Sequence, residues 1–301
     1  MQSVDKLNKE FALPGHLEFK EGPGRFIFAD IKNDRASAEL FLHGAQITSF
    51  IPKDNAPVLF QSGLSQFEAG KAIRGGIPIS WPWFADHPTD SSKPAHGFAR
   101  TSAWQVRAAE QKTPSETLIR LGLKDSEETR KLFGYKFDLE ITISIGRELN
   151  LVLRMKNMDN ESFTVTSAFH SYYSIHNISD VSVHGLEGSG YIDKVDDFNT
   201  KTQDGPVRIT GETDRIYMKT AGDCVIEDPG FNRSIRISKS GSGSTVVWNP
   251  WDEKASQMKD LGNLDYLKFI CVETANAGDD TVTLSPGEEH ELQMNIAVED
   301  I

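Results

Sequence analysis

The sequence predicts an all-β protein, a large antiparallel β-sandwich with few short helices. Apolar residues alternate with polar ones over nine positions in residues 137–145, FDLEITISI, and residues 149–157, LNLVLRMKN, repeat the pattern after a gap of three residues. A period of two residues is typical of a half-buried strand, and so short a connection indicates an antiparallel hairpin. Turn residues separate further strand patterns at intervals of about ten residues, whereas helical periodicity is scarce, which favours a sandwich over a parallel α/β sheet.

The remaining elements follow in chain order. We expect further strands at residues 36–44, 45–52, 102–111, 116–124, 162–169, 182–188, 206–211, 234–240, 244–250 and 267–275. Helical spacing is limited to residues 125–133, where Ser126 and Thr129 can cap the first turn, and to residues 252–260. Strand patterns extend from residue 25 to residue 298 without a linker, so residues 1–301 are expected to form a single domain with roughly the first 20 residues at its periphery.

The composition argues against several classes of partner. The formal net charge of −12 and the pI near 5.2 disfavour a surface for nucleic acid or anionic lipid. No segment reaches the roughly eighteen apolar residues of a membrane span, and the N-terminus has no apolar leader. Cys224 and Cys271 are too few for a disulfide framework, so we expect both to be reduced. The prediction is a cytoplasmic monomer without nucleic-acid or membrane partners.

Residues 73–84, IRGGIPISWPWF, are too rich in Gly, Pro and Trp to form an ordinary strand. Trp81 and Trp83 offer flat apolar surfaces on which a sugar ring could stack. A loop that crosses the end of the sandwich and buries both rings in the core explains these residues equally well. The two interpretations stay open at this point.

Two arginines belong to such irregular stretches. Arg74 lies in RGG, and Arg100 lies in PAHGFAR, residues 94–100, where His96 precedes it by four positions. The forked guanidinium donors of arginine match paired oxygens, so Arg74 and Arg100 could clamp a phosphate or a carboxylate. The alternative is that each arginine pairs with a nearby aspartate, such as Asp86 or Asp90, and spacing alone does not decide between these.

A histidine and a glutamate stand out in strand-like surroundings. His170 interrupts TSAFHSYYSI, residues 166–175, and a lone histidine of this kind is more often a core or edge residue than a catalyst. Glu273 follows an apolar run within FICVETAN, residues 269–276. Desolvation there would raise the pKa of its carboxyl toward the range of a general base at neutral pH, and the alternative is an exposed glutamate at a strand end.

Signatures of cofactor chemistry are missing from the sequence. It contains no GxGxxG after a strand, no P-loop, no HExxH and no GxSxG. His170, His176 and His184 fall in one region, but their spacing resembles no zinc ligand set. We therefore expect neither a cofactor nor a catalytic metal.

Six separated motifs occur in one order over residues 25–298. They are RGGIPISWPWF, PAHGFAR, TSAFHSYYSI, TDRIY (residues 213–217), VVWNPW (residues 246–251) and CVETA. In this order they resemble the glucose-6-phosphate 1-epimerase, or hexose-6-phosphate mutarotase, branch of the aldose 1-epimerase family. Because the motifs cover almost the whole chain, the resemblance is far more specific than a lone histidine or glutamate.

The resemblance implies a galactose mutarotase-like supersandwich with a sugar cleft and no cofactor. It implies that His170 and Glu273 are the catalytic pair. Substrate contacts would come from Arg74, Arg100 and Asp214, with His96 in the same cleft. Two positions depart from the family pattern: Ala95 stands where some relatives carry Gln, and Tyr173 stands where many carry Phe.

The expected reaction is the interconversion of the α and β anomers of a hexose 6-phosphate, which makes the protein an isomerase acting on a small-molecule sugar phosphate. Glu273 as a carboxylate would take the proton of the anomeric hydroxyl while His170 as an imidazolium donates to the ring oxygen. Rotation in the open aldehyde and closure would then give the other anomer. A non-catalytic carbohydrate-binding sandwich is the main alternative, and a regulatory partner protein that retains the cleft is a third.

Overall fold

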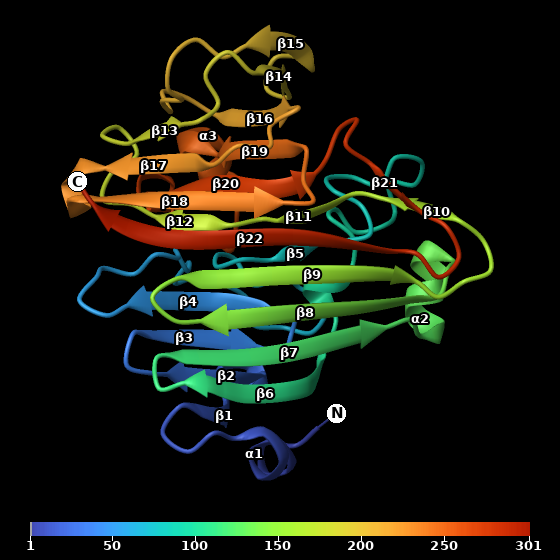
Figure 1. The fold of residues 1–301 in the computed structure, drawn as a ribbon. Coiled ribbons are helices and arrows are strands. Elements are labelled where there is room, and N and C mark those ends of the chain that lie inside the picture. Colours follow the sequence, from blue (N-terminus) through green and yellow to red (C-terminus); the bar gives the residue numbers. More distant parts are fainter. Residues whose placement is uncertain (1) are drawn as a thin grey trace.

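The computed structural model describes residues 2–301, which form mostly antiparallel sheets, as predicted (Figure 1). One eight-stranded sheet has the order β13-β17-β18-β22-β9-β8-β7-β6. Its strands are β6 (Gln105–Thr113), β7 (Glu116–Lys124), β8 (Phe137–Ile145), β9 (Leu149–Asn157), β13 (Ser182–His184), β17 (Cys224–Asp228), β18 (Arg233–Ser240) and β22 (Glu289–Asp300). The predicted hairpin is confirmed, because β8 and β9 pair in antiparallel register over their full lengths.

A second eight-stranded sheet carries the centre of the molecule. Its order is β15-β14-β16-β19-β20-β11-β5, and β12 pairs with β20 beside β11. The strands are β5 (Ile79–Ser80), β11 (Ser167–Phe169), β12 (Tyr172–Ser174), β14 (Gly190–Asp193), β15 (Asn199–Thr202), β16 (Thr213–Met218), β19 (Ser244–Asn249) and β20 (Phe269–Asn276). The strand predicted at residues 162–169 is therefore divided, because Thr166 leaves the ladder and its backbone N–H donates to the Pro82 carbonyl.

Two smaller sheets complete the sandwich. A four-stranded sheet comprises β1 (Leu17–Glu21), β2 (Ile27–Lys32), β3 (Ala36–Phe41) and β4 (Gln46–Pro52), and β10 (Phe163–Val165) pairs with β21 (Val282–Leu284). Figure 1 shows β6 to β9, β18 and β22 as a broad layer in front of the strands of the other sheets. The buried face of β8, with Leu139 and Ile141, belongs to the same apolar core as Ile270 and Val272 of β20.

Residues 2–301 contain three α-helices: α1 (Val4–Phe11), α2 (Glu127–Phe133) and α3 (Trp251–Gln257). The cap predicted for α2 is confirmed, since Ser126 and Thr129 form a reciprocal capping box. Helix α1 was not predicted, and its Leu7 is buried in the main core. The described part of the chain also contains four short 3-10 turns, η1 (Pro23–Arg25), η2 (Ala99–Thr101), η3 (Pro229–Phe231) and η4 (Asp265–Leu267). No helix within residues 2–301 has the length and apolar character needed to cross a membrane.

Some sequence-based expectations were wrong. Residues 206–211 form no strand, and Val207 makes only an isolated bridge with Val183. The interpretation of Trp81 and Trp83 as sugar-stacking surfaces is also wrong, since both are buried. Trp81 is fully buried and packs against Phe98, and the Trp83 indole N–H donates to the Pro94 carbonyl at 2.8 Å. Both cysteines are free and buried, as expected.

Candidate active site

The register of the central sheet builds the floor of a cleft. On β20, Ile270 and Val272 point into the sandwich core, so the alternation of a strand sends Cys271 and Glu273 to the opposite face. Glu273 lies buried in the interior of β20, so it is the desolvated carboxyl and not the exposed strand-end glutamate of the alternative interpretation. Its register partner on β19 is Val246. Two residues earlier on the same face of β20, Cys271 has Trp248 of β19 as its register partner, and Trp248 in turn pairs with Asp214 of β16.

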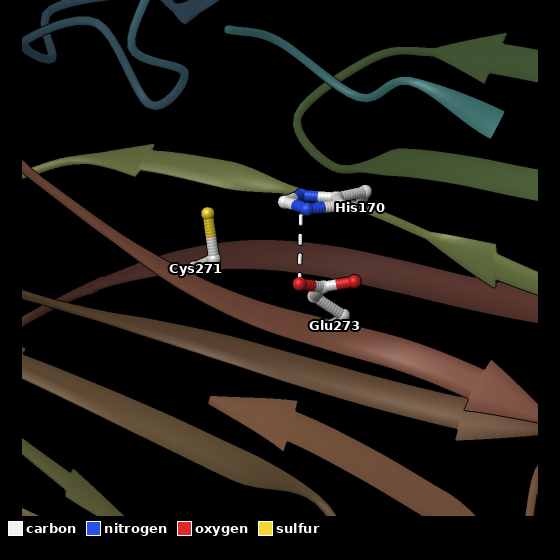
Figure 2. Close-up of side chains that lie close together, drawn as sticks. All are labelled: His170, Cys271 and Glu273. Carbon is white, nitrogen blue, oxygen red and sulfur yellow. Dashed lines mark ion pairs between the residues drawn. The ribbon is translucent and has the colours of Figure 1, made fainter. Parts of the chain in front are cut away.

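His170 lies over this floor at the break between β11 and β12, two short strands that both pair with β20. Its backbone N–H donates to the Pro78 carbonyl at 2.9 Å. The imidazole stacks on the Tyr172 ring, with a centroid distance of 5.0 Å and an interplanar angle of 14°. Figure 2 shows the ring facing Glu273, with 3.5 Å between His170 Nδ1 and Glu273 Oε1.

All six residues proposed from the sequence line one cleft with a volume of about 330 Å³. They come from segments far apart in the chain, including the RGG loop, the HGFAR turn and β16. The lining consists of Arg74, Phe84, Ala85, Asp86, His96, Arg100, His170, Lys194, Asp214, Val246, Trp248, Lys254 and Glu273. The fold therefore brings together three carboxyl groups, two imidazoles and four cationic side chains.

The two floor groups lack hydrogen-bond partners. Glu273 is 1% exposed and His170 is 7% exposed. Within residues 2–301, neither carboxyl oxygen of Glu273 nor Nδ1 of His170 forms a hydrogen bond. Buried polar atoms are nearly always paired, so such orphans mark a place where a ligand can supply the missing partners.

Burial sets the protonation of the pair. It raises the pKa of Glu273 well above its ordinary value, and the nearby Asp214 carboxylate adds to the rise. It lowers the pKa of His170 to about 3, with Arg100 and Arg74 adding to the fall. Both directions favour the uncharged forms, a carboxylic acid beside a neutral imidazole. This differs from the expected carboxylate and imidazolium by the transfer of one proton within the pair.

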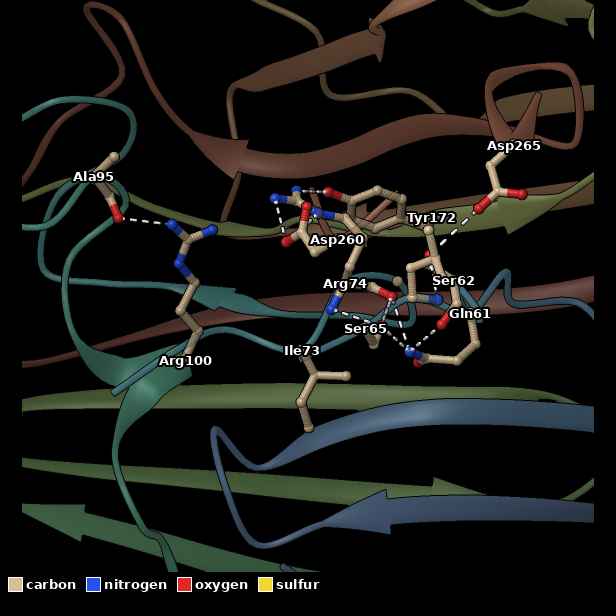
Figure 3. Close-up of polar contacts among 12 residues, drawn as sticks. Gln61, Ser62, Ser65, Ile73, Arg74, Ala95, Arg100, Tyr172, Asp260 and Asp265 are labelled. Atoms are coloured by element: carbon tan, nitrogen blue, oxygen red, sulfur yellow. Dashed lines mark hydrogen bonds and ion pairs between the residues drawn. The ribbon is translucent and has the colours of Figure 1, made fainter. Parts of the chain in front are cut away.

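Arg74 is held by other residues (Figure 3). Its Nε and Nη2 donate to one carboxylate oxygen of Asp260 at 3.2 and 3.0 Å, and its Nη1 donates to the Tyr172 hydroxyl at 2.8 Å. The aspartates suggested by sequence proximity, Asp86 and Asp90, are not its partners. Arg74, Arg100, Lys194 and Lys254 form the cationic wall of the cleft. Through its bond to Tyr172, Arg74 connects this wall to the ring that stacks on His170.

Arg100 has much looser ties. Its Nη2 donates to the Ala95 carbonyl at 2.8 Å, so at this departure from the family pattern a backbone oxygen makes the contact (Figure 3). Its Nε is buried without a partner, and no carboxylate among the described residues lies within ion-pair distance. Burial lowers the pKa of Arg100 to about 10, and Arg74 adds to the fall. The cleft wall therefore holds a cation without a counter-ion.

His96 is fixed as a neutral donor. Its Nδ1 accepts the Ala85 backbone N–H at 3.3 Å and lies 3.2 Å from the Ser80 hydroxyl, so the proton of the neutral ring resides on Nε2. Burial lowers its pKa well below the ordinary value. The adjacent Gly97 is required because a Cβ there would lie 2.0 Å from the Trp81 carbonyl oxygen.

Sequence reasoning missed two cations of the cleft. Lys194 follows β14 and forms an ion pair with Asp214 at 2.7 Å, and Lys254 of α3 pairs with Glu212 at 2.7 Å. Neither lysine belongs to a recognisable motif, and both lie in segments without strand alternation. The Lys194–Asp214 pair could be anticipated only from the strand register that brings β14 beside β16.

Comparisons with known proteins agree with this architecture. The family model described as Aldose 1-epimerase matches residues 29–297. A protein of Escherichia coli K12 named "Putative glucose-6-phosphate 1-epimerase" is 34% identical over 250 residues, which cover 83% of this chain and 83% of the relative. A protein of the same name from Cenchrus ciliaris is 34% identical over 261 residues, covering 84% and 78%.

Solved structures extend the likeness to the whole fold. A Salmonella typhimurium protein described as a "putative mutarotase" superposes with a TM-score of 0.90 at 30% identity, covering 97% of this chain and 96% of that one. A galactose mutarotase-related enzyme of Lactobacillus acidophilus shares the fold alone, with a TM-score of 0.70 at 16% identity. This confirms the predicted galactose mutarotase-like sandwich, and the chain belongs to the aldose 1-epimerase family.

Proposed function

We propose that the protein interconverts the α and β anomers of hexose 6-phosphates, glucose 6-phosphate first among them, by acid–base opening and closure of the sugar ring. The observation that carries the proposal is the buried, unpartnered Glu273–His170 pair on the floor of a cleft with cationic walls. The names of the curated relatives support the choice of glucose 6-phosphate.

The pair holds the single proton that the reaction needs. Ring opening removes a proton from the anomeric hydroxyl and delivers one to the ring oxygen. Glu273 as carboxylate accepts the first while His170 as imidazolium gives the second, which leaves a carboxylic acid and a neutral imidazole. Burial favours this uncharged form of Glu273 and His170. The pair is therefore in its more stable protonation state when the sugar is the open aldehyde. Rotation about the first carbon–carbon bond and the reverse transfers close the other anomer.

A bound phosphate would favour the reactive form. Arg100 and Arg74 contribute to the low pKa of His170. A dianion placed against these cations would offset their field, and it would make an imidazolium on His170 less costly. The phosphate would thus help to create the acid that acts on the other end of the sugar.

Arg100 is the first candidate for the phosphate contact because it lacks a counter-ion among residues 2–301, whereas Arg74 already binds Asp260. Lys194 and Lys254 extend the cationic wall. In a protein of net charge −12, long-range attraction does not steer a dianion to the cleft. Short, charge-assisted hydrogen bonds must therefore give the selectivity. We also propose that Asp214 and His96 contact sugar hydroxyls.

A non-catalytic carbohydrate-binding protein is the weaker alternative. Binding alone would not require an acid and a base held together at the cleft floor, and family membership favours an isomerase. The mechanism uses only side chains of this chain. A cytoplasmic monomer without nucleic-acid or membrane partners remains our prediction from the sequence.

Exchange spectroscopy tests the proposal directly. After treatment with a chelator, the protein should accelerate the exchange between α- and β-glucose 6-phosphate seen by NMR, without added metal or nucleotide. An exchange rate equal to that in buffer alone would remove the enzymatic interpretation and leave the binding protein.

A further inference from the structure

A thiol lies beside the catalytic pair and has no part in the proposed reaction. Cys271 and Glu273 are two residues apart on β20 and project from the same face, and His170 lies across from them (Figure 2). One ligand atom from each of the three residues, a ring nitrogen, a thiol sulfur and a carboxyl oxygen, lies within 4.8 Å of the other two. All three side chains are buried.

The three donors suit a borderline-soft divalent cation. Imidazole nitrogen, thiolate sulfur and carboxylate oxygen are the ligands of Zn²⁺ in proteins. Bonds of about 2.0 to 2.3 Å in a tetrahedral site place neighbouring ligand atoms roughly 3.3 to 3.7 Å apart. His170 Nδ1 and Glu273 Oε1 are already 3.5 Å apart, and one ligand atom from each of the three residues lies within 4.8 Å of the other two.

Hydrogen bonding and charge point to the same ligand. Both Glu273 oxygens and His170 Nδ1 lack a hydrogen-bond partner within residues 2–301. A cation that binds these atoms therefore does not have to break hydrogen bonds of theirs. The cationic wall, above all Arg74 and Arg100, opposes a bare dication. A carboxylate and a thiolate together carry two negative charges, which make the occupied centre neutral overall. The thiol proton of Cys271 and the carboxylic acid proton of Glu273 both leave to the buffer as the sulfur–metal and oxygen–metal bonds form.

We propose that His170, Cys271 and Glu273 form a zinc-binding inhibitory site, in which one Zn²⁺ blocks the floor of the cleft reversibly. A metal held there occupies the two groups that must move the sugar's protons, so catalysis and metal binding exclude each other. The inhibitory consequence depends on the proposed function, but the binding itself does not.

Cd²⁺ is the probe for binding, because a Cd²⁺–thiolate bond absorbs in the ultraviolet. Titration of the wild-type protein should give a charge-transfer band that saturates at one Cd²⁺ per chain and disappears when Zn²⁺ is added in excess. Cys271→Ala should lose the band, with Cys271→Ser as a second variant that better preserves packing. Cys224→Ser is the matched control, because Cys224 is also buried and free but lies on β17, and it should keep the band.

Inhibition is measured by the anomer-exchange assay in zinc-buffered solution. The zinc concentration for half inhibition should rise at least tenfold in Cys271→Ala, which should keep its metal-free turnover within about threefold of wild type, and should be unchanged in Cys224→Ser. A wild-type band without any exchange activity would leave the metal site standing and refute the proposed function. Equal bands and equal zinc sensitivity in wild type and both Cys271 variants would refute the site, and would assign the band to the thiolate of Cys224.

Discussion

The floor and the wall of the cleft are built in opposite ways. The floor groups are Glu273, which projects from β20, and His170, which lies at the break between β11 and β12 of the same sheet. Both are buried without hydrogen-bond partners within residues 2–301. The wall groups come from loops, a turn and a short helix, and most are already paired. The pairs are Arg74 with Asp260, Lys194 with Asp214, and Lys254 with Glu212.

The difference separates the two tasks of the site. In the proposed reaction, the sheet fixes the two groups that transfer protons and leaves their lone pairs for the substrate. The carboxylate partners of Arg74, Lys194 and Lys254 reduce the repulsion among these cations. In the proposed function, a bound phosphate would replace such a carboxylate as the partner of a wall cation. Leaving a buried polar group unpaired costs about 1 to 3 kcal/mol, so the floor reduces stability for the sake of function.

The largest effect is expected from substitution of the two floor residues. Glu273→Gln and His170→Asn should each lower kcat for anomer exchange by roughly a hundredfold or more, the usual scale for a positioned acid or base. Both variants should fold, because each replacement removes a buried ionisable group and keeps its shape. Steady-state kinetics and thermal unfolding measure the two effects.

Matched controls exist outside the cleft. His43 is 7% exposed, as His170 is, and Glu39 is an exposed glutamate on strand β3, outside the cleft. His43→Asn and Glu39→Gln should keep turnover within about twofold. Near-normal turnover in a folded Glu273 or His170 variant would show that its assigned role is wrong.

The next effect separates the two arginines of the wall. Arg100→Ala should lower kcat/KM for glucose 6-phosphate by roughly tenfold to a hundredfold, with much less change for unphosphorylated glucose. Arg74→Ala should cost less selectivity, because Asp260 already holds its guanidinium. The ratio of the two specificity constants is the measurement.

Arg107→Ala is the control for a lost arginine, since this side chain is 25% exposed and ion-paired on the outer layer, close to the 23% of Arg74. It should leave the ratio unchanged. If Arg100→Ala reduced the activity on both sugars equally, Arg100 would shape the loop and would not read the phosphate.

The same comparison shows what the sequence could predict. The period-two pattern gave β8 and β9 residue for residue, and the motif order identified six residues that the fold gathers in one cleft. It could not show that Trp81 points into the core, because a Gly- and Pro-rich segment has no periodicity from which to read a face. Nor could it pair Arg74 with Asp260, since those residues meet only through the tertiary fold.

Stability should depend on pH in opposite directions for the two floor groups. The pKa of Glu273 is raised in the folded protein, so its contribution to stability is present below the ordinary value of 4.5 and is lost as pH rises. The pKa of His170 is lowered to about 3, so its contribution is present above 6.5 and is lost as pH falls toward 3. Each slope is at most about 1.4 kcal/mol per pH unit.

Denaturant unfolding from pH 5 to pH 8 measures these slopes. Relative to wild type, Glu273→Gln should gain stability as the pH rises, and His170→Asn should gain stability as the pH falls below 6.5. Stability differences that stay constant with pH would mean that both groups titrate alike in the folded and unfolded states, and that the uncharged pair does not exist.

The smallest expected effect contrasts two neighbouring tyrosines on opposite faces of β12. The Tyr172 hydroxyl accepts from Arg74 Nη1 at 2.8 Å on the cleft side, whereas the Tyr173 hydroxyl is buried in the core, where it donates to the Met294 sulfur, a weak acceptor, at 3.8 Å. Tyr172→Phe should therefore lower kcat/KM for glucose 6-phosphate by roughly twofold to tenfold, the value of one ordinary hydrogen bond, while the ring still stacks on His170. Tyr173→Phe should leave the kinetics unchanged and alter the free energy of unfolding by less than about 1 kcal/mol, because the hydroxyl it removes donates to a weak sulfur acceptor. A kinetic defect in Tyr173→Phe that matched the one in Tyr172→Phe would show that the core face of β12 also controls the floor.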